Sequence, residues 1–256
     1  MLALEFPPLS HITNWPEFFG NDTWGVNKVV LVYAFAVLFT MVLFTLGNKK
    51  QLVPTGAQNL AEMSVEFIED GIVMETIGEK GLNYTPLLIT FFFYVFFSNI
   101  FEIIPVIQMP GTARIAMPMV LALIAYVVYH GAGVKEHGPL GYLKHRLIPP
   151  GVPAALLILI IPIEFIIAFI VTPFTHTVRL FANLLAGHIL LVTFALLTSS
   201  LITAETQQFL LKPMAILPFF MLVFLTAFEV LVAFLQAYIF TILTAVYIGG
   251  AAHPEH

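Results

Sequence analysis

Residues 152–202 read VPAALLILIIPIEFIIAFIVTPFTHTVRLFANLLAGHILLVTFALLTSSLI, a run of about fifty residues that is apolar almost throughout. At a rise of 1.5 Å per residue, one helix of this length would measure about 75 Å. The hydrocarbon layer of a membrane is only about 30 Å thick, and membrane helices usually tilt by about 20°. The run therefore predicts a long membrane helix that is strongly tilted, bent at Pro162 and Pro173, or split.

A second long apolar run extends from Met214 to Gly250 and contains only Glu229 and Gln236 as strongly polar residues. As a helix it would measure about 55 Å, which is again too long for an upright span. We expect the two runs to form an antiparallel helical hairpin that turns near Thr206 to Gln208. The chain shows no internal repeat, so a transporter built from inverted repeats is disfavoured.

The composition of the whole chain agrees with a membrane protein. Of its 256 residues, 59% are hydrophobic and 10% are charged, and the mean hydropathy is +0.96. Soluble domains carry about 25% charged residues. The net charge of −5 argues against a nucleic-acid partner, and no glycine-rich nucleotide-binding loop is present. The absence of Cys excludes disulfides and thiolate metal sites, and we expect neither a cofactor nor a metal.

Three shorter apolar segments precede the hairpin and are expected to span the membrane: Val29 to Leu46, Tyr84 to Ile104, and Ile115 to Tyr129. The third is expected to end at His130-Gly131, before a basic loop from Lys135 to Arg146. His130, His137 and His145 are interpreted as solvated residues of that loop, and His253 and His256 as part of a short tail.

The segment from Leu60 to Met74 contains four acidic residues and is interpreted differently. Its apolar residues Leu60, Met63, Phe67 and Val73 indicate an amphipathic helix on the surface. The expected fold is thus an all-α integral membrane protein with about five to six membrane helices, including the tilted hairpin, and one amphipathic surface helix. We expect a single membrane domain over 1–256, divided into an outer segment (1–28), the first spans with the inner loop (29–150), the hairpin (151–250) and a tail (251–256).

Lysine and arginine residues in the loops predict the orientation of the chain, because they accumulate on the inner side. With the N-terminus outside and the C-terminus inside, six basic residues lie in inner loops and three in outer segments. The inner residues are Lys49, Lys50, Lys80, Lys135, Lys144 and Arg146; the outer ones are Lys28, Arg114 and Lys212. The polar and acidic start of the chain, Met1 to Asn27, lacks the basic region of a cleaved signal peptide, so none is expected.

Ionisable residues inside the predicted spans are the main functional signal. A charge at mid-membrane costs about 2.5–3.5 kcal/mol, and such residues are functional by default. Arg179, Glu164 and Glu229 carry this cost in full, and Glu102 carries part of it. At about 100° per residue, one helical face holds small and polar residues around the arginine: Thr172, Thr175, Arg179, Ala182, Asn183 and Ala186. His188 points to the opposite side. A second helix can therefore approach the arginine closely.

The antiparallel hairpin also predicts which residues lie at equal depth. Pairing Arg179 with Gln236 and pairing His188 with Glu229 require the same register to within two residues. In the predicted orientation, Asn99, Glu102, His188 and Glu229 lie on the outer side of Arg179, and Glu164 lies on the inner side. Groups that exchange protons are thus separated by a permanent cation. This layout is typical of a proton path interrupted by an electrostatic barrier, since arginine cannot itself relay a proton.

Three segments resemble subunit a of the F-type ATP synthase. Residues 173–188, PFTHTVRLFANLLAGH, resemble its signature; residues 235–247, LQAYIFTILTAVY, look like its last helix; and residues 99–105, NIFEIIP, are similar to a third landmark. The resemblance covers roughly Gln51 to Tyr247. The pattern RLF-x-N-x-x-AG is highly specific, whereas the Asn99 segment alone would be weak.

The resemblance implies a stator subunit that provides two offset half-channels to a rotating ring of c subunits. Arg179 matches the essential arginine, and Asn183 and Gln236 match polar residues that face the ring or position it. Asn99, Glu102, His188 and Glu229 match the outer proton path, with His and Glu in the swapped order found in some members. Glu164 resembles the acid of the inner path, although it lies fifteen residues before Arg179 where the family pattern has fourteen. His176 lies one turn inward of Arg179; it is either an ordinary polar helix residue or, with Glu164, a candidate for the inner path.

The resemblance also implies partners and a location. The partners would be the c-subunit ring, the b and b′ peripheral stalk subunits, the remainder of the complex and the lipid bilayer. The location would be a bacterial plasma membrane.

Two other functional classes remain open from the residues themselves. One is an autonomous proton or ion channel, or a secondary transporter without a rotor; the other is a membrane scaffold with buried ion pairs.

Overall fold

The computed structural model describes residues 28–47, 51, 55–104, 111–148, 151–203 and 212–252. Within these ranges the chain forms helices and no strand, and five helices are long and apolar enough to cross a membrane. The predicted class, an all-α membrane protein, is confirmed. The N-terminal segment, the turn near Thr206 to Gln208, and His253 and His256 lie outside the described residues.

The first span agrees closely with its predicted range, whereas the second begins and ends several residues earlier than predicted. Helix α2 covers Lys28–Gly47, and the second span consists of a short 3₁₀ segment, η2 (Glu79–Tyr84), followed by α4 (Thr85–Ile100). Pro86 stands in the first turn of α4, where its missing N–H leaves no helical hydrogen bond unmade. Short η3 (Gly111–Ala113) lies between α4 and the next long helix.

The predicted amphipathic helix is present as α3 (Ala57–Ile68), continued by a π-helical segment, η1 (Glu69–Met74). The two sides of this segment have different environments. Ile68, Ile72 and Val73 are buried against the rest of the chain, whereas Leu60 and Met63 are exposed and would contact lipid in a membrane. Phe67 lies at the boundary: it is partly exposed, and its ring also contacts Phe92, Phe234 and Tyr238.

Helix α5 (Ala116–Leu147) corrects the prediction for the third span. It does not end at His130-Gly131, and most of the expected basic loop is helical. The interruption is at Gly138, which adopts φ 69° and ψ 165° before Pro139. Glycine alone tolerates this conformation, and proline lacks the N–H that would continue the helix. His130 is not solvated as predicted, because its Nδ1 lies 2.7 Å from the hydroxyl of Tyr142.

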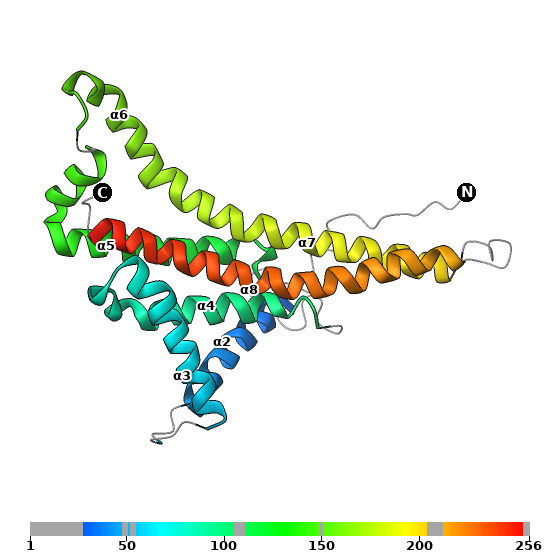
Figure 1. The fold of residues 1–256 in the computed structure, drawn as a ribbon. Helices are drawn as coiled ribbons and strands as arrows, with labels where there is room; N and C mark the ends of the chain where they lie inside the picture. Colours follow the sequence, from blue (N-terminus) through cyan, green and yellow to red (C-terminus); the bar gives the residue numbers. More distant parts are fainter. Residues whose placement is uncertain are drawn as a thin grey trace, which may run out of the picture.

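The long hairpin is present (Figure 1). Its first arm runs without a break through α6 (Ala154–Ile166), a π-helical segment η4 (Ile167–Val171) and α7 (Thr172–Ile202). Its second arm is α8 (Ile216–Ala252). The irregularity in the first arm lies between Pro162 and Pro173, the two residues at which the sequence predicted a bend. Helices α7 and α8 lie side by side, while α6 diverges from α8 (Figure 1).

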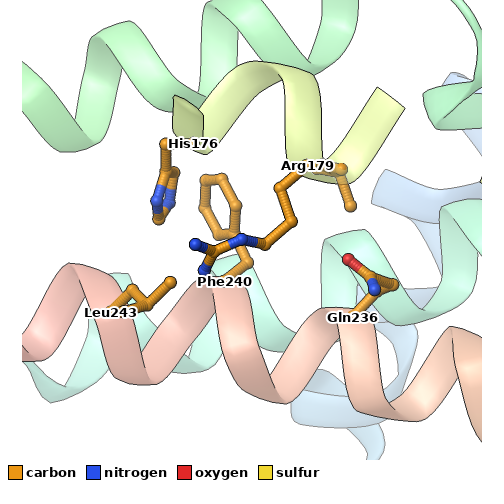
Figure 2. A pocket seen from close by; sticks show the side chains of 6 residues that line it. His176, Arg179, Gln236, Phe240 and Leu243 are labelled. Atoms are coloured by element: carbon orange, nitrogen blue, oxygen red, sulfur yellow. The ribbon is translucent and has the colours of Figure 1, made fainter. Parts of the chain in front are cut away.

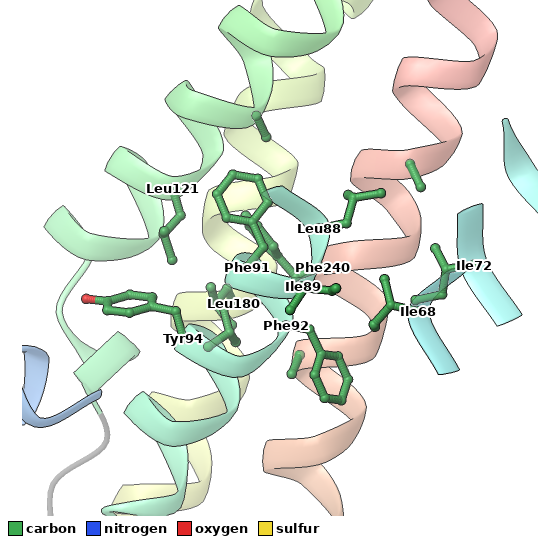
Figure 3. Packing of buried hydrophobic residues seen from close by; sticks show 14 of the residues in the cluster. Ile68, Ile72, Leu88, Ile89, Phe91, Phe92, Tyr94, Leu121, Leu180 and Phe240 are labelled. Atoms are coloured by element: carbon green, nitrogen blue, oxygen red, sulfur yellow. The ribbon is translucent and has the colours of Figure 1, made fainter. Parts of the chain in front are cut away.

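Helix α8 packs against α4, α5 and α7 and so lies at the centre of the bundle. The contacts are mainly aromatic and aliphatic (Figure 3). Phe91 of α4 meets Phe240 of α8 edge-on with ring centroids 5.4 Å apart, and Leu180 of α7 is buried in the same cluster. Since Leu180 follows Arg179 directly, this packing holds the arginine at a fixed position along α8.

Candidate functional site

The two sides of α7 have different environments. One side is exposed and the other is buried against α8, α5 and the segment that follows α4. The exposed residues of the predicted stripe are Thr175, Arg179, Ala182, Asn183 and Ala186, and the buried residues include Leu180, Leu184, Gly187 and His188. Helical periodicity explains the division. The chain thus presents a guanidinium among small side chains on its surface, and an imidazole on the opposite side.

Arg179 lines a small open cavity between α7 and α8 (Figure 2). His176, Arg179 and Leu180 come from α7, and Gln236, Phe240 and Leu243 come from α8. Gln236 lies at the level of Arg179, as the hairpin register predicts. It is only 5% exposed, so it lies behind the arginine and is not part of the exposed stripe.

His176, a candidate for the inner path from the sequence, lines this cavity. It is 6% exposed, and its ring lies 4.2 Å from the ring of Phe240. Its Nε2 atom is buried and makes no hydrogen bond with the described residues. Buried polar atoms in proteins are nearly always hydrogen-bonded. His176 therefore presents an available polar atom one helical turn from Arg179.

His188 contacts a buried carboxyl group on the other side of α7. Its Nδ1 atom lies 3.4 Å from Oε1 of Glu102, in the segment that follows α4. A direct pair between His188 and Glu229 was predicted, and the described contacts show Glu102 as the partner instead. This contact depends on the tertiary fold. The segment that follows α4 packs against α7, and the register between α7 and α8 does not predict where α4 lies.

Glu229 nevertheless lies at the predicted depth. A Cβ atom added at Gly187 would collide with the carboxylate of Glu229, so the two residues are in direct contact across α7 and α8. His188, the residue after Gly187, contacts Glu102, so Glu102 and Glu229 border the same turn of α7. Two carboxylates and one imidazole, contributed by α8, the segment after α4, and α7, therefore converge on one buried region.

Asn99 extends this buried region along α4. Its Oδ1 accepts a hydrogen bond of 2.6 Å from the hydroxyl of Thr112 in η3. Tyr33 of α2 donates a hydrogen bond of 2.8 Å to the carbonyl of Gly111 and so positions η3. Thr112 is not among the residues predicted from the sequence; no local pattern marks it, because its contact with Asn99 spans thirteen residues.

Several buried polar atoms near Asn99 make no hydrogen bond within the described part of the chain. They are the Tyr94 hydroxyl, the Ser98 hydroxyl, Nδ2 of Asn99 and Oε2 of Glu229. Tyr94 and Ser98 are four residues apart on one side of α4, and Glu102 follows four residues later, just beyond the end of the helix. This spacing is a signal from which Ser98 could have been predicted. These atoms offer hydrogen-bonding sites to water or to a mobile proton.

Glu164 lies in α6, on the far side of η4 from Arg179, and it is half-buried. The structure does not bring it to the cavity of Arg179. However, the π-helical segment contains one residue more than a regular helix would over the same rise. The fifteen-residue separation is thus equivalent in angle to fourteen regular positions, which is the spacing of the family pattern. Among the described residues, no group of three or more His, Asp or Glu side chains is arranged to hold a metal ion.

Comparison with known proteins agrees with these observations. The sequence matches the family described as ATP synthase A chain over residues 29–249. It is 42% identical to ATP synthase subunit a of Frankia alni over 256 residues, covering 97% of this chain and 87% of that one. It is 41% identical to the protein of the same name from Rhodococcus erythropolis, covering 98% and 88%, and 41% identical to that of Streptomyces lividans, covering 94% and 87%. The chain belongs to the ATP synthase A chain family, as a multi-pass membrane protein whose partners are the other subunits of the ATP synthase.

Proposed function

We propose that this chain is the proton-translocating stator subunit of its ATP synthase, with two offset half-channels that open onto a rotating c ring and are separated by Arg179. The observation that carries the proposal is the division of α7 into two sides. Arg179 is exposed among small residues, while His188, Glu102 and Glu229 are buried behind it.

The outer half-channel follows the buried polar residues. A proton would enter near Asn99, pass the His188–Glu102 pair and Glu229, and reach a carboxylate on the ring. Support comes from the 3.4 Å contact between His188 and Glu102 and from the buried polar atoms along α4 that make no hydrogen bond with the described residues. Carboxylates and imidazole both exchange protons readily, so each step requires only a short transfer.

Arg179 acts as the electrostatic barrier between the half-channels. Its pKa above about 12 prevents it from passing on a proton, and its charge favours a deprotonated ring carboxylate beside it. Asn183 lies on the same exposed side and contacts the ring, and Gln236 supports the arginine from behind. Each proton that crosses releases about 2.3 kcal/mol per 100 mV of membrane potential, which the ring converts into rotation.

The inner half-channel would leave the cavity of Arg179 through His176 and continue toward Glu164. His176 is supported by its place in that cavity and by its available Nε2 atom. Glu164 is supported by the π-helical segment, which restores the angular relation of the family pattern.

The further partners and the location complete the proposal. The exposed stripe of α7 faces the c ring, the b and b′ subunits of the peripheral stalk hold the chain against rotation, and lipid covers the remaining apolar surface. The membrane is a bacterial plasma membrane, with the N-terminus outside and the C-terminus inside, in agreement with the distribution of Lys and Arg.

The replacement Arg179→Ala tests the proposal in the assembled enzyme in inverted membrane vesicles. We expect proton-driven ATP synthesis and ATP-driven proton pumping to be lost, because the charge barrier is removed, while hydrolysis by the soluble catalytic part persists. Thr175→Ala, one helical turn away on the same exposed side, is the matched control and should retain most of the activity. Normal ATP synthesis by Arg179→Ala would contradict the proposal.

The alternative of an autonomous proton channel makes a different prediction in liposomes. If the chain conducts by itself, the purified chain alone should dissipate a pH gradient. A stator subunit should do so only together with a c ring. The observation that favours the stator is the exposed small-residue stripe around Arg179, which an autonomous channel does not require.

A further inference from the structure

The π-helical segment η4 leaves one backbone carbonyl without a partner in its own helix. The N–H of Thr172 bonds to the carbonyl of Ile167, five residues back, and so is not used by Ala168. The next possible donor to Ala168 would be residue 173, which is proline and has no N–H. Ala168 is fully buried. An unpaired buried carbonyl destabilises a fold, so η4 requires a donor from outside the helix.

Tyr129 of α5 supplies that donor. Its hydroxyl donates a long hydrogen bond of 3.5 Å to the carbonyl of Ala168, and its side chain is only 3% exposed. The ring also packs against Tyr247 of α8, with centroids 5.5 Å apart. Tyr129 therefore connects η4 to the centre of the bundle.

The neighbouring residue of α5 contacts the neighbouring residue of η4. The imidazole of His130 stacks on the ring of Phe169, with centroids 5.0 Å apart and the planes 9° from parallel. The other side of the imidazole is held by Tyr142, whose hydroxyl lies 2.7 Å from Nδ1. Two consecutive residues of α5 thus hold two consecutive residues of the π-helical segment.

The extra residue of η4 sets the angle between α6 and α7. A regular helix would turn by about 100° for that residue, so loss of the π-helical geometry would rotate α6 relative to α7 by a comparable angle. Arg179 is held by the packing of α7 on α8, and the rotation would therefore displace the side of α6 that carries Glu164. We infer that Tyr129 is a positioning residue, whose hydroxyl holds η4 and thereby sets the angle of Glu164 relative to Arg179. This inference rests on the proposed function, in which both residues belong to the proton path.

Tyr129→Phe in the assembled enzyme is the primary test, because it removes the hydroxyl and keeps the ring. We expect faster amide hydrogen exchange in the peptide covering 163–175 and a loss of ATP-driven proton pumping of about threefold, the order of one neutral hydrogen bond. Tyr126→Phe is the matched control. Tyr126 lies one turn away on α5, its hydroxyl makes no hydrogen bond within the described residues, and both measurements should stay unchanged.

Adding Pro173→Ala to Tyr129→Phe should partly restore the hydrogen bond to the carbonyl of Ala168. It introduces an N–H five residues after Ala168, which can donate to the carbonyl that Tyr129→Phe leaves unpaired. The double variant should therefore exchange more slowly and pump faster than Tyr129→Phe alone. A general loss of packing at Tyr129 would not be corrected by a backbone donor on another helix.

The outcomes separate this inference from the proposed function. Unchanged hydrogen exchange in Tyr129→Phe would overturn the role of the hydroxyl in holding η4. Faster exchange with unchanged pumping would overturn the link from η4 to the proton path, and failure of Pro173→Ala to rescue would contradict the hydrogen-bond explanation. Normal pumping by Arg179→Ala would instead refute the proposed function, whatever the exchange experiment shows.

Discussion

His188 and Glu102 show how strongly a single buried pair depends on both of its members. Each side chain is almost fully buried, and the two approach each other to 3.4 Å. Removing one of two buried polar partners leaves the other uncompensated, which typically costs about 1–3 kcal/mol and more for a charged group. Removing both at once leaves no such group. The two residues should therefore behave as one unit.

A double-mutant cycle tests that expectation. His188→Leu and Glu102→Leu should each lower ATP-driven proton pumping by about tenfold or more, and the double variant should be impaired much less than the product of the two effects. A parallel cycle of His188→Leu with Glu164→Gln is the control, because those residues are in separate parts of the arm and share no contact. Strict additivity between His188 and Glu102 would contradict the expectation that the two residues act as one unit.

The same residues show what a sequence can and cannot specify at this scale. The exposed position of Arg179 and the buried position of His188 follow from helical periodicity, because nine residues correspond to two and a half turns. The depth of Gln236 follows from the hairpin register. The pairing of His188 with Glu102 could not be predicted in this way, since it depends on how the end of α4 approaches α7.

Among the helices, the position of the break in α5 depends on a single glycine. Gly138 adopts φ 69° and ψ 165°, a region that is nearly restricted to glycine, and the following Pro139 prevents a regular helix. Beyond the break the chain returns so that the ring of Tyr142 covers Gly133, where a Cβ atom would collide with it. This return also brings Tyr142 to His130.

Gly138→Ala should consequently destabilise the chain by about 1–3 kcal/mol, the cost of placing a non-glycine residue in that backbone region. Gly131→Ala is the matched control on the same helix. A Cβ atom there would meet nothing within 4 Å, and the higher helix propensity of alanine should raise stability by up to about 1 kcal/mol. Denaturant unfolding of both variants in mild detergent provides the comparison. Equal stabilities for the two variants would contradict the assignment of the break to Gly138.

The elements were predictable to different degrees for physical reasons. The hairpin follows from two apolar runs that are too long for upright spans. The predicted end of this span at His130-Gly131 was wrong. A glycine does not end a helix when the residues before and after it continue to pack against the bundle. In the sequence, the π-helical segment is visible only as one extra residue between Glu164 and Arg179. The local pattern of apolar residues does not show at which position that residue lies.

At the scale of the whole molecule, α8 separates two kinds of surface. It packs against α4, α5 and α7, and it contributes Gln236 beside Arg179 and Glu229 beside Gly187. The exposed stripe of α7 can therefore contact a moving partner without disturbing the buried polar residues on the other side. In the proposed function, the rotor surface and the proton path are therefore separate parts of the chain.

Cysteine cross-linking to the c ring in the assembled enzyme tests that separation most directly, and the chain contains no Cys of its own to interfere. Cys introduced singly at Ala182, Ala186 or His188 is paired with a Cys on the outer helix of the ring, near its carboxylate. Ala182→Cys and Ala186→Cys should form disulfides with the ring readily, because both positions are exposed beside Arg179, whereas His188→Cys should not, because His188 is buried on the opposite side of α7. Cross-linking of His188→Cys as fast as that of Ala186→Cys would contradict the account.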